Sequence, residues 1–311
     1  MNAKKFLVLY AVIITAVLGL VVLRSNTSSN ESAPAAAKVK MDDRNLPQIV
    51  KGVALEKNYS FAGERLPVAK NFDVRERLDR ELMVNSYWHS STSLNIKMAY
   101  RVFPVIEPIL REYNIPEDFK YLAVAESNLR NAVSPAGAKG VWQFMPASAK
   151  YYDLEINREV DERYHLEKLT HVACKYLLHL KERFGSWTLA AAAYNMGETR
   201  MARELDNQRT DNYYDMNLND ETSRYVFRIV AIKEILSDPS RFGFYLDKSD
   251  GYEPLDDYRI VTVDQSISNL GDFAAEHGTT YRMLKVYNPW LISHRLTVST
   301  GNSYEIKIPE G

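Results

Sequence analysis

The stretch that ends at Asn128 has the residue types best suited to acid–base chemistry. A nearly unbroken apolar run, Tyr121 to Ala125, is followed by the carboxylate of Glu126, the hydroxyl of Ser127 and the amide of Asn128. A carboxyl group at the edge of an apolar face can act as a general acid or base, because burial disfavours its charged form. Glu126 is therefore the first candidate for a catalytic residue.

A helix must carry Glu126. Pro116 suits the first helical position, and Glu117 and Asp118 place negative charge at the positive end of the helix dipole. Leu122 precedes Glu126 by four residues, so the two share one face, which we expect to be half buried. Burial and the nearby helix C-terminus would both raise the pKa of Glu126, as a general acid for glycosidic cleavage requires. A glutamate at a helix end is more often a solvated surface residue, so other motifs must support this prediction.

Three further stretches supply neutral polar groups. They are Gly140-Val-Trp-Gln-Phe-Met-Pro146, Ala192-Ala-Tyr-Asn-Met-Gly197 and Glu221-Thr-Ser-Arg-Tyr-Val226. Together they contain the amides of Gln143 and Asn195 and the phenols of Tyr194 and Tyr225. One acid with several amides and phenols suits a sugar polymer rich in N-acetyl groups, because such a ligand needs neutral donors and acceptors.

These motifs occur in the order and spacing of a known family. Glu126-Ser127, Gly140-Val-Trp-Gln143, Ala192-Ala-Tyr-Asn195 and Tyr225 resemble those of the soluble-lytic-transglycosylase family, the goose-lysozyme-like enzymes that cleave peptidoglycan. The chain looks closest to membrane-bound D-type members, which pair such a domain with C-terminal LysM modules. The resemblance covers roughly residues 85–240, and Trp142 replaces the methionine common at its position in the family.

The resemblance implies a role for each site residue. Glu126 would be the catalytic acid, and Ser127, Gln143, Tyr194, Asn195 and Tyr225 would bind the sugar or orient the acid. Helix-end capping is an equally good interpretation of Ser127 and Asn195. Core packing is the better interpretation of Trp142 and Phe144.

The resemblance also implies the reaction. Glu126 would protonate the glycosidic oxygen of the β-1,4 bond between N-acetylmuramic acid and N-acetylglucosamine. It would then act as base on the C6 hydroxyl of the muramic acid unit, which closes a 1,6-anhydro ring. Ordinary glycosidases need two carboxylates, and Asp153 or Glu155 could fold back to provide the second. The alternatives are a hydrolase like goose-type lysozyme and a non-catalytic peptidoglycan-binding protein.

Composition excludes several other functions. The net charge of -1 gives no basic field of the kind that nucleic-acid binding requires. The single cysteine, Cys174, allows no internal disulfide, and its apolar helical setting predicts an inert thiol. His165, His171 and His179 share one predicted helix without paired-ligand spacing, so we expect no metal site and no cofactor.

The N-terminus carries an export signal. Lys4 and Lys5 precede an apolar run over residues 6–23, which has about the length needed to span a bilayer. Residues 1–24 are thus predicted to anchor the protein in the inner membrane, with the rest of the chain in the cell envelope on the periplasmic side. A cleaved signal and a soluble periplasmic protein are the alternative. The expected partners are peptidoglycan glycan strands and, through this segment, the membrane.

The predicted fold class is mainly α. After a flexible tether over residues 25–45 we expect a helical extension over 46–95, with a helix from Val74 to Trp88 that packs on the following domain. Tyr87 and Trp88 are predicted to close its core. Residues 96–240 are expected to form the lysozyme-like catalytic domain, and residues 241–257 a linker.

The helices of the catalytic domain can be placed individually. They are predicted over 97–113, broken by Pro104 and Pro108; over 116–126; over 164–184, ended by Gly185; from Trp187, capped by Ser186, to about Asn195; and over 221–236. Residues 131–140 are predicted to form a loop and residues 203–219 a polar linker.

The last fifty residues have a different pattern. Alternating residues predict strands over 258–263 and 303–309, with short helices over 267–277 and 280–287 between them. This βααβ order over 258–309 resembles a LysM module, as does Asn288-Pro289 after the second helix. Asp264-Gln-Ser266 replaces the usual Gly-Asp-Thr turn, so the module either binds glycan or only packs on the catalytic domain.

Overall fold

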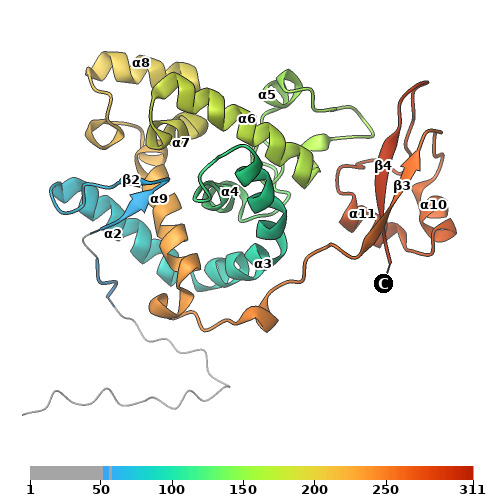
Figure 1. Ribbon diagram of the computed structural model, residues 1–311, viewed down its shortest axis with the longest axis horizontal. Coiled ribbons are helices and arrows are strands. Elements are labelled where there is room, and N and C mark those ends of the chain that lie inside the picture. Colours follow the sequence, from blue (N-terminus) through green and yellow to red (C-terminus); the bar gives the residue numbers. More distant parts are fainter. Residues whose placement is uncertain (1–51, 56–57, 311) are drawn as a thin grey trace, which may run out of the picture. The chain divides into compact units, whose positions relative to one another are not determined.

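The computed structural model describes residues 52–55 and 58–310 (Figure 1). The predicted membrane segment over residues 6–23 and the tether over 25–45 lie outside these residues. Within the described part of the chain, no helix is both long enough and apolar enough to cross a bilayer.

The chain folds into a helical part followed by a small α/β tail, so the predicted mainly α fold class with a βααβ tail is confirmed. The helical part contains β1 (Ser60–Phe61), β2 (Glu64–Arg65), α2 (Phe72–Tyr87), α3 (His89–Glu112), α4 (Phe119–Ser127), α5 (Pro146–Tyr151), η1 (Glu162–Tyr164), α6 (Leu166–Phe184), α7 (Trp187–Met196), α8 (Glu198–Gln208), η2 (Tyr213–Asp215) and α9 (Asp220–Ser237). The short helices η3 (Pro239–Phe242) and η4 (Lys248–Asp250) lead to the tail.

One hydrophobic core joins most of these helices. α2 packs along α9, α4 packs against α9 and α3, and α7 packs between α6 and α9. Leu122, Val124 and four consecutive alanines of α7, Ala190 to Ala193, are completely buried in this core. The small alanine side chains allow the backbone of α7 to approach its neighbours closely. Helix α4 lies at the centre of the helical part (Figure 1).

The helix ends on either side of residue 185 follow the predicted chemistry. Gly185 ends α6 with a left-handed φ of 77°, and the Ser186 hydroxyl accepts the N–H of Leu189 at the start of α7. Glu64 also binds this helix start, accepting the N–H groups of Trp187 at 2.7 Å and Thr188 at 2.9 Å. A carboxylate stabilises the positive end of the helix dipole, so the β1–β2 hairpin fastens the N-terminal extension to α7.

The predicted break in the first long helix was wrong. α3 runs without interruption from His89 to Glu112, with Pro104 and Pro108 inside it. Both prolines lie on the solvent face, where water can reach the carbonyls that lose their hydrogen bonds. The opposite face, with Val102 and Ile106, is buried and holds the helix in place. The expected boundary between the N-terminal helical extension and the catalytic domain, at residue 95, falls within α3.

Three other local predictions also differ from the structure. The predicted linker over 203–219 begins inside α8, because Met201 and Leu205 on one face of that helix pack against the core. Trp88 does not close the core: it is 63% exposed at the corner between α2 and α3. Pro116 does not begin α4, since residues 116–118 form a turn and the helix starts at Phe119.

The tail has the predicted order of elements. β3 (Tyr258–Val263) pairs antiparallel with β4 (Tyr304–Pro309), and α10 (Leu270–Glu276) and α11 (Tyr281–Tyr287) lie between them in sequence. Asn288 is fully buried, and its amide bonds both the Leu284 carbonyl and the backbone of Lys307. The Asn-Pro motif therefore joins the end of α11 to β4.

Candidate active site

Glu126 is delivered by the last turn of α4. Helix α4 buries Phe119, Tyr121, Leu122, Ala123 and Val124, whereas the side chain of Glu126 is only partly exposed. Asn128 ends the helix in the left-handed conformation, with its N–H bonded to the carbonyl of Val124. The carboxyl group thus lies at the edge of a buried face near a helix C-terminus, as the sequence predicted.

The pKa of Glu126 is raised to about 7. Burial is the largest cause, because the protein interior disfavours the carboxylate. The hydrogen bond from the Tyr225 hydroxyl to Oε1 of Glu126 lowers the pKa, since it stabilises the charged form. The charge of Glu221 raises it and that of Arg228 lowers it. Near neutral pH the group can therefore both give and take a proton.

Two buried phenols adjoin this carboxyl group. Tyr225, on α9, is 1% exposed, and burial raises its pKa well above the ordinary value. Tyr194, on α7, donates a hydrogen bond to the Trp142 carbonyl at 2.6 Å, and burial raises its pKa in the same way. The charge of Glu126 contributes to both shifts. Both phenols remain neutral donors at physiological pH.

The loop over residues 139–145 lies beside α4. Gly140 has a φ of +80°, and a Cβ at this position would come within 1.8 Å of the Arg163 carbonyl, so only glycine fits. Gln143 also has a positive φ, 52°, and its amide Nε2 donates to the carbonyls of Ala132 and Gly140. The segment over residues 139–145 is therefore a tightly bonded loop.

Ser127 connects α4 to this loop. It is buried, and its hydroxyl bonds the Val141 carbonyl at 2.8 Å and the Ala123 carbonyl at 3.2 Å. Trp142 is completely buried and donates from Nε1 to Thr170. The core interpretation of Trp142 is confirmed, and Phe144 is likewise buried.

Asn195 joins α7 to α9. Its Oδ1 accepts the Thr222 hydroxyl at 2.8 Å, and its Nδ2 donates to Glu221 at 3.4 Å. The side-chain groups of Ser127, Tyr194 and Asn195 thus all bond other parts of the protein. Ser127 and Tyr194 link α4 and α7 to the loop over residues 139–145, and Asn195 links α7 to α9.

The two carboxylates that could fold back toward Glu126 do not act on it. Glu155 accepts the hydroxyl of Tyr304 in the tail, and Asp153 is exposed. Neither contributes to the pKa shift of Glu126, whereas Glu221 does. Glu221 is the carboxylate that the sequence interpretation missed.

Glu81 is a second missed residue. It lies on α2 and is 1% exposed, with Oε1 2.6 Å from Nε of Arg224 and Oε2 3.7 Å from Nε of Arg228. Glu81 therefore balances the charge of Arg228, which acts on Glu126. The sequence contained one signal for this residue: Glu81 lies between Leu78 and Leu82 on the apolar face of α2, and this position predicts a buried carboxylate.

No group of three or more His, Cys, Asp or Glu side chains in the described ranges is arranged to hold a metal ion. His171 contacts the Tyr113 hydroxyl, and His179 contacts Glu198. Cys174 is completely buried, and burial raises its pKa to about 12, which makes the thiol inert as predicted.

Two protein-family models match the chain. A transglycosylase SLT domain matches residues 104–217, and a soluble lytic transglycosylase C-terminal LysM-like domain matches residues 259–311. Glu126, Ser127, Gln143, Tyr194 and Asn195 lie inside the first range, whereas Tyr225 lies beyond it on α9.

Several known proteins are similar to the chain. It is 28% identical over 200 residues to the membrane-bound lytic murein transglycosylase D of Escherichia coli (strain K12), covering 62% of this chain and 43% of that protein. It is 35% identical over 121 residues to a protein of Alteromonas sp. (strain M-1) whose name refers to tributyltin chloride resistance. This match covers 37% of this chain and 58% of that protein.

The structure of the lytic transglycosylase Slt from Pseudomonas aeruginosa is 18% identical, with a TM-score of 0.41, over 60% of this chain and 32% of that one. The chain thus spans less than two thirds of the length of each of these relatives.

Proposed function

We propose that this chain, which carries a transglycosylase SLT domain and the LysM-like domain of soluble lytic transglycosylases, is a peptidoglycan lytic transglycosylase. The observation that carries the proposal is the state of Glu126, a partly buried carboxyl group with a pKa of about 7 and a hydrogen bond from Tyr225. The name of the E. coli relative supports the same activity.

The reaction uses Glu126 twice. Its carboxyl proton passes to the glycosidic oxygen between N-acetylmuramic acid and N-acetylglucosamine, and the bond to C1 of the muramic acid unit breaks. The carboxylate then takes the proton of the C6 hydroxyl, whose oxygen bonds to C1 and closes a 1,6-anhydro ring. No water is consumed, and Glu126 ends protonated. A pKa near neutrality suits both steps, because the group must lose and regain one proton in each cycle.

The surrounding residues hold this geometry. Tyr225 fixes Oε1 and stabilises the carboxylate formed after the first proton transfer. Ser127 and Tyr194 bond carbonyls of the loop over residues 139–145 and thereby position it against α4. Gln143 and Asn195 complete the set that contacts the sugar or orients the acid.

The proposed domain organisation follows from the same assignment. The catalytic domain extends to residue 240, since Tyr225 lies on α9, and the LysM-like tail spans residues 258–309. A peptidoglycan substrate requires export, and the basic and apolar N-terminal segment over residues 1–24 provides the signal or anchor. We place the enzyme in the cell envelope, on the periplasmic side of the inner membrane.

Turnover of purified peptidoglycan tests the proposal. The wild-type chain should release soluble fragments, and Glu126→Gln, which keeps the size of the side chain but cannot give up a proton, should reduce release at least about a hundredfold. Arg203→Glu on the exposed face of α8 is the control and should keep full activity. Equal release by the Glu126→Gln and wild-type proteins would refute the assignment.

A further inference from the structure

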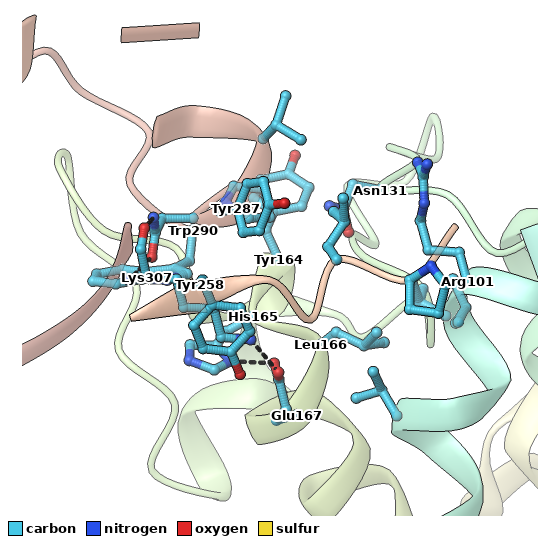
Figure 2. A pocket seen from close by; sticks show the side chains of 18 of the residues that line it. Arg101, Asn131, Tyr164, His165, Leu166, Glu167, Tyr258, Tyr287, Trp290 and Lys307 are labelled. Atoms are coloured by element: carbon cyan, nitrogen blue, oxygen red, sulfur yellow. Dashed lines mark hydrogen bonds and ion pairs between the residues drawn. The ribbon is translucent and has the colours of Figure 1, made fainter. Parts of the chain in front are cut away.

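A cavity of about 670 Å³ lies between the helical part and the tail (Figure 2). Its walls come from α3, from Leu129 to Asn131 after α4, from the start of α6, from the linker before β3 and from α11. Arg101 and Asn131 lie at one end, and Trp290 and Lys307 at the other. The site around Glu126 described above does not use this cavity.

The contacts between the two parts fix one side of the cavity. Asp161 N–H bonds the Trp290 carbonyl at 2.9 Å, and Ile292 N–H bonds the Glu159 carbonyl at the same distance. Val160, between these two residues, is buried in the hydrophobic core of the tail. Tyr304 adds a hydrogen bond to Glu155.

The linker fixes the opposite side. Tyr252 N–H bonds the Lys97 carbonyl of α3 at 3.1 Å, and Arg101 Nε donates to the Glu253 carbonyl at 2.8 Å. The cavity is therefore formed in advance, and its two walls are held together without a ligand.

The charge of the lining is mainly positive. It contains three arginines and two lysines but three carboxylates. Lys307 and Glu167 pair with each other, so their charges cancel. Arg130 and Arg282 are exposed at the cavity and have no ion-pair partner among the described residues. This excess favours an anionic ligand.

Aromatic side chains provide the rest of the surface. Tyr164, Tyr258 and Tyr287 line the cavity and are each partly exposed, with the rings of Tyr258 and Tyr287 6.2 Å apart. Such rings offer apolar faces to a ligand and phenols to its amides. An elongated ligand with amide bonds and free carboxylates fits this lining better than a neutral sugar.

The cavity also adjoins the elements that hold the acid. Leu129, Arg130 and Asn131 directly follow the helix of Glu126, and the lining residue Val141 accepts the hydrogen bond of Ser127. A ligand here would touch the segment that directly follows the helix of Glu126 and the loop that Ser127 binds.

We propose that this cavity binds the carboxylate-bearing peptide stem of peptidoglycan, next to the glycan strand that Glu126 cleaves. This inference rests on the proposed function and specifies its substrate: a strand that keeps its peptides would be held by both parts of the chain. The tail then contributes to substrate binding through its α11 face.

Isothermal titration calorimetry of the whole chain tests this inference. The probes are a synthetic stem tetrapeptide, the same peptide with its carboxylates amidated, and a tetramer of N-acetylglucosamine. We expect the free peptide to bind and amidation to weaken its binding at least about tenfold. Higher salt should also weaken peptide binding.

Two charge reversals locate the site. Arg282→Glu on the tail and Arg130→Glu on the catalytic side should each weaken peptide binding about tenfold and leave the sugar tetramer unaffected. Arg203→Glu, which places the same change on α8, is the matched control. Thermal melts of each variant verify folding, and the salt dependence of the wild type remains as a test if a variant does not fold.

Three results would overturn the inference. The first is no peptide binding at millimolar concentration, and the second is a peptide affinity that neither charge reversal changes. The third is that the charge reversals weaken binding of the sugar tetramer instead of binding of the peptide. The last would make the cavity a glycan site. Because binding does not depend on turnover, peptide binding without cleavage of peptidoglycan would refute the proposed function alone. Cleavage without peptide binding would refute this inference alone.

Discussion

Tyr225 donates a hydrogen bond to Oε1 of Glu126, although 99 residues separate them in the sequence. The packing of α4 against α9 brings the two side chains together. Burial favours the protonated form of Glu126 and the hydrogen bond favours the charged form, so the pKa of about 7 is a balance between them.

Tyr225→Phe removes the hydrogen bond and leaves the burial. The pKa of Glu126 should rise by about one to two pH units, since a hydrogen bond to a charged group contributes about 1.5–3 kcal/mol and one pH unit corresponds to about 1.4 kcal/mol. The wild-type kcat/KM should fall as pH rises through about 7, where the acid loses its proton. In Tyr225→Phe this decline should begin at higher pH and the maximal rate should drop at least about tenfold. A pH–rate profile measures both, and a shift toward lower pH would contradict the account.

The same pKa makes stability depend on pH. The pKa of Glu126 is higher in the folded protein than in the unfolded chain, so the folded state binds this proton more tightly. The stabilisation from this proton is complete below the ordinary carboxyl pKa and is lost as pH rises to about 7. Above neutral pH, Glu126→Gln should therefore be more stable than wild type by about 3 kcal/mol in free energy of unfolding, and it should melt at a higher temperature. The difference should shrink at acidic pH. Melting curves that keep the same separation at every pH would rule this out.

Glu81→Gln tests the charge balance behind the site. Glu81 pairs with Arg224 and Arg228, and removing one member of a buried ion pair costs about 3–5 kcal/mol. The uncompensated charge of Arg228 should also lower the pKa of Glu126 and move the alkaline decline of activity to lower pH. Denaturant unfolding and a pH–rate profile of the remaining activity measure the two effects.

Glu76→Gln provides the comparison for this variant, because Glu76 is an exposed residue on the same helix. It should match wild type in both measurements. A Glu81→Gln protein with reduced stability and an unchanged pH profile would show that Glu81 acts on the fold alone.

Helices could be predicted from sequence where apolar spacing and capping residues agree, as for the helix that ends at Gly185 and the helix that begins after Ser186. The two strands of the tail could be predicted from their alternating residues. The β1–β2 hairpin was missed because its turn is Ala62-Gly63, with positive φ at both residues and without the usual asparagine or aspartate.

The candidate site was predicted only in part for a related reason. Four short motifs, in the order and spacing of a known family, identified Glu126, Ser127, Gln143, Tyr194, Asn195 and Tyr225. Glu81 and Glu221 act through space on residues of other helices, and single-sequence patterns do not record such distances. The inward direction of the Ser127 hydroxyl is likewise set by its contact with Val141, 14 residues away.

Glu221→Gln distinguishes one-carboxylate from two-carboxylate catalysis. Glu221 raises the pKa of Glu126 by its charge, so neutralising it should lower that pKa slightly and reduce kcat/KM by less than about tenfold. An ordinary hydrolase would lose nearly all activity on losing its second carboxylate. Steady-state rates on purified peptidoglycan separate the two, and loss of activity equal to that of Glu126→Gln would favour the hydrolase.

Mass spectrometry of the glycan ends released in water labelled with heavy oxygen tests the central claim most directly. The purified chain is incubated with intact peptidoglycan, and the masses of the new muramic acid ends are measured. Intramolecular attack by the C6 hydroxyl predicts 1,6-anhydro ends that are lighter than reducing ends by one water and carry no label. Labelled reducing ends would contradict it and identify the protein as a hydrolase.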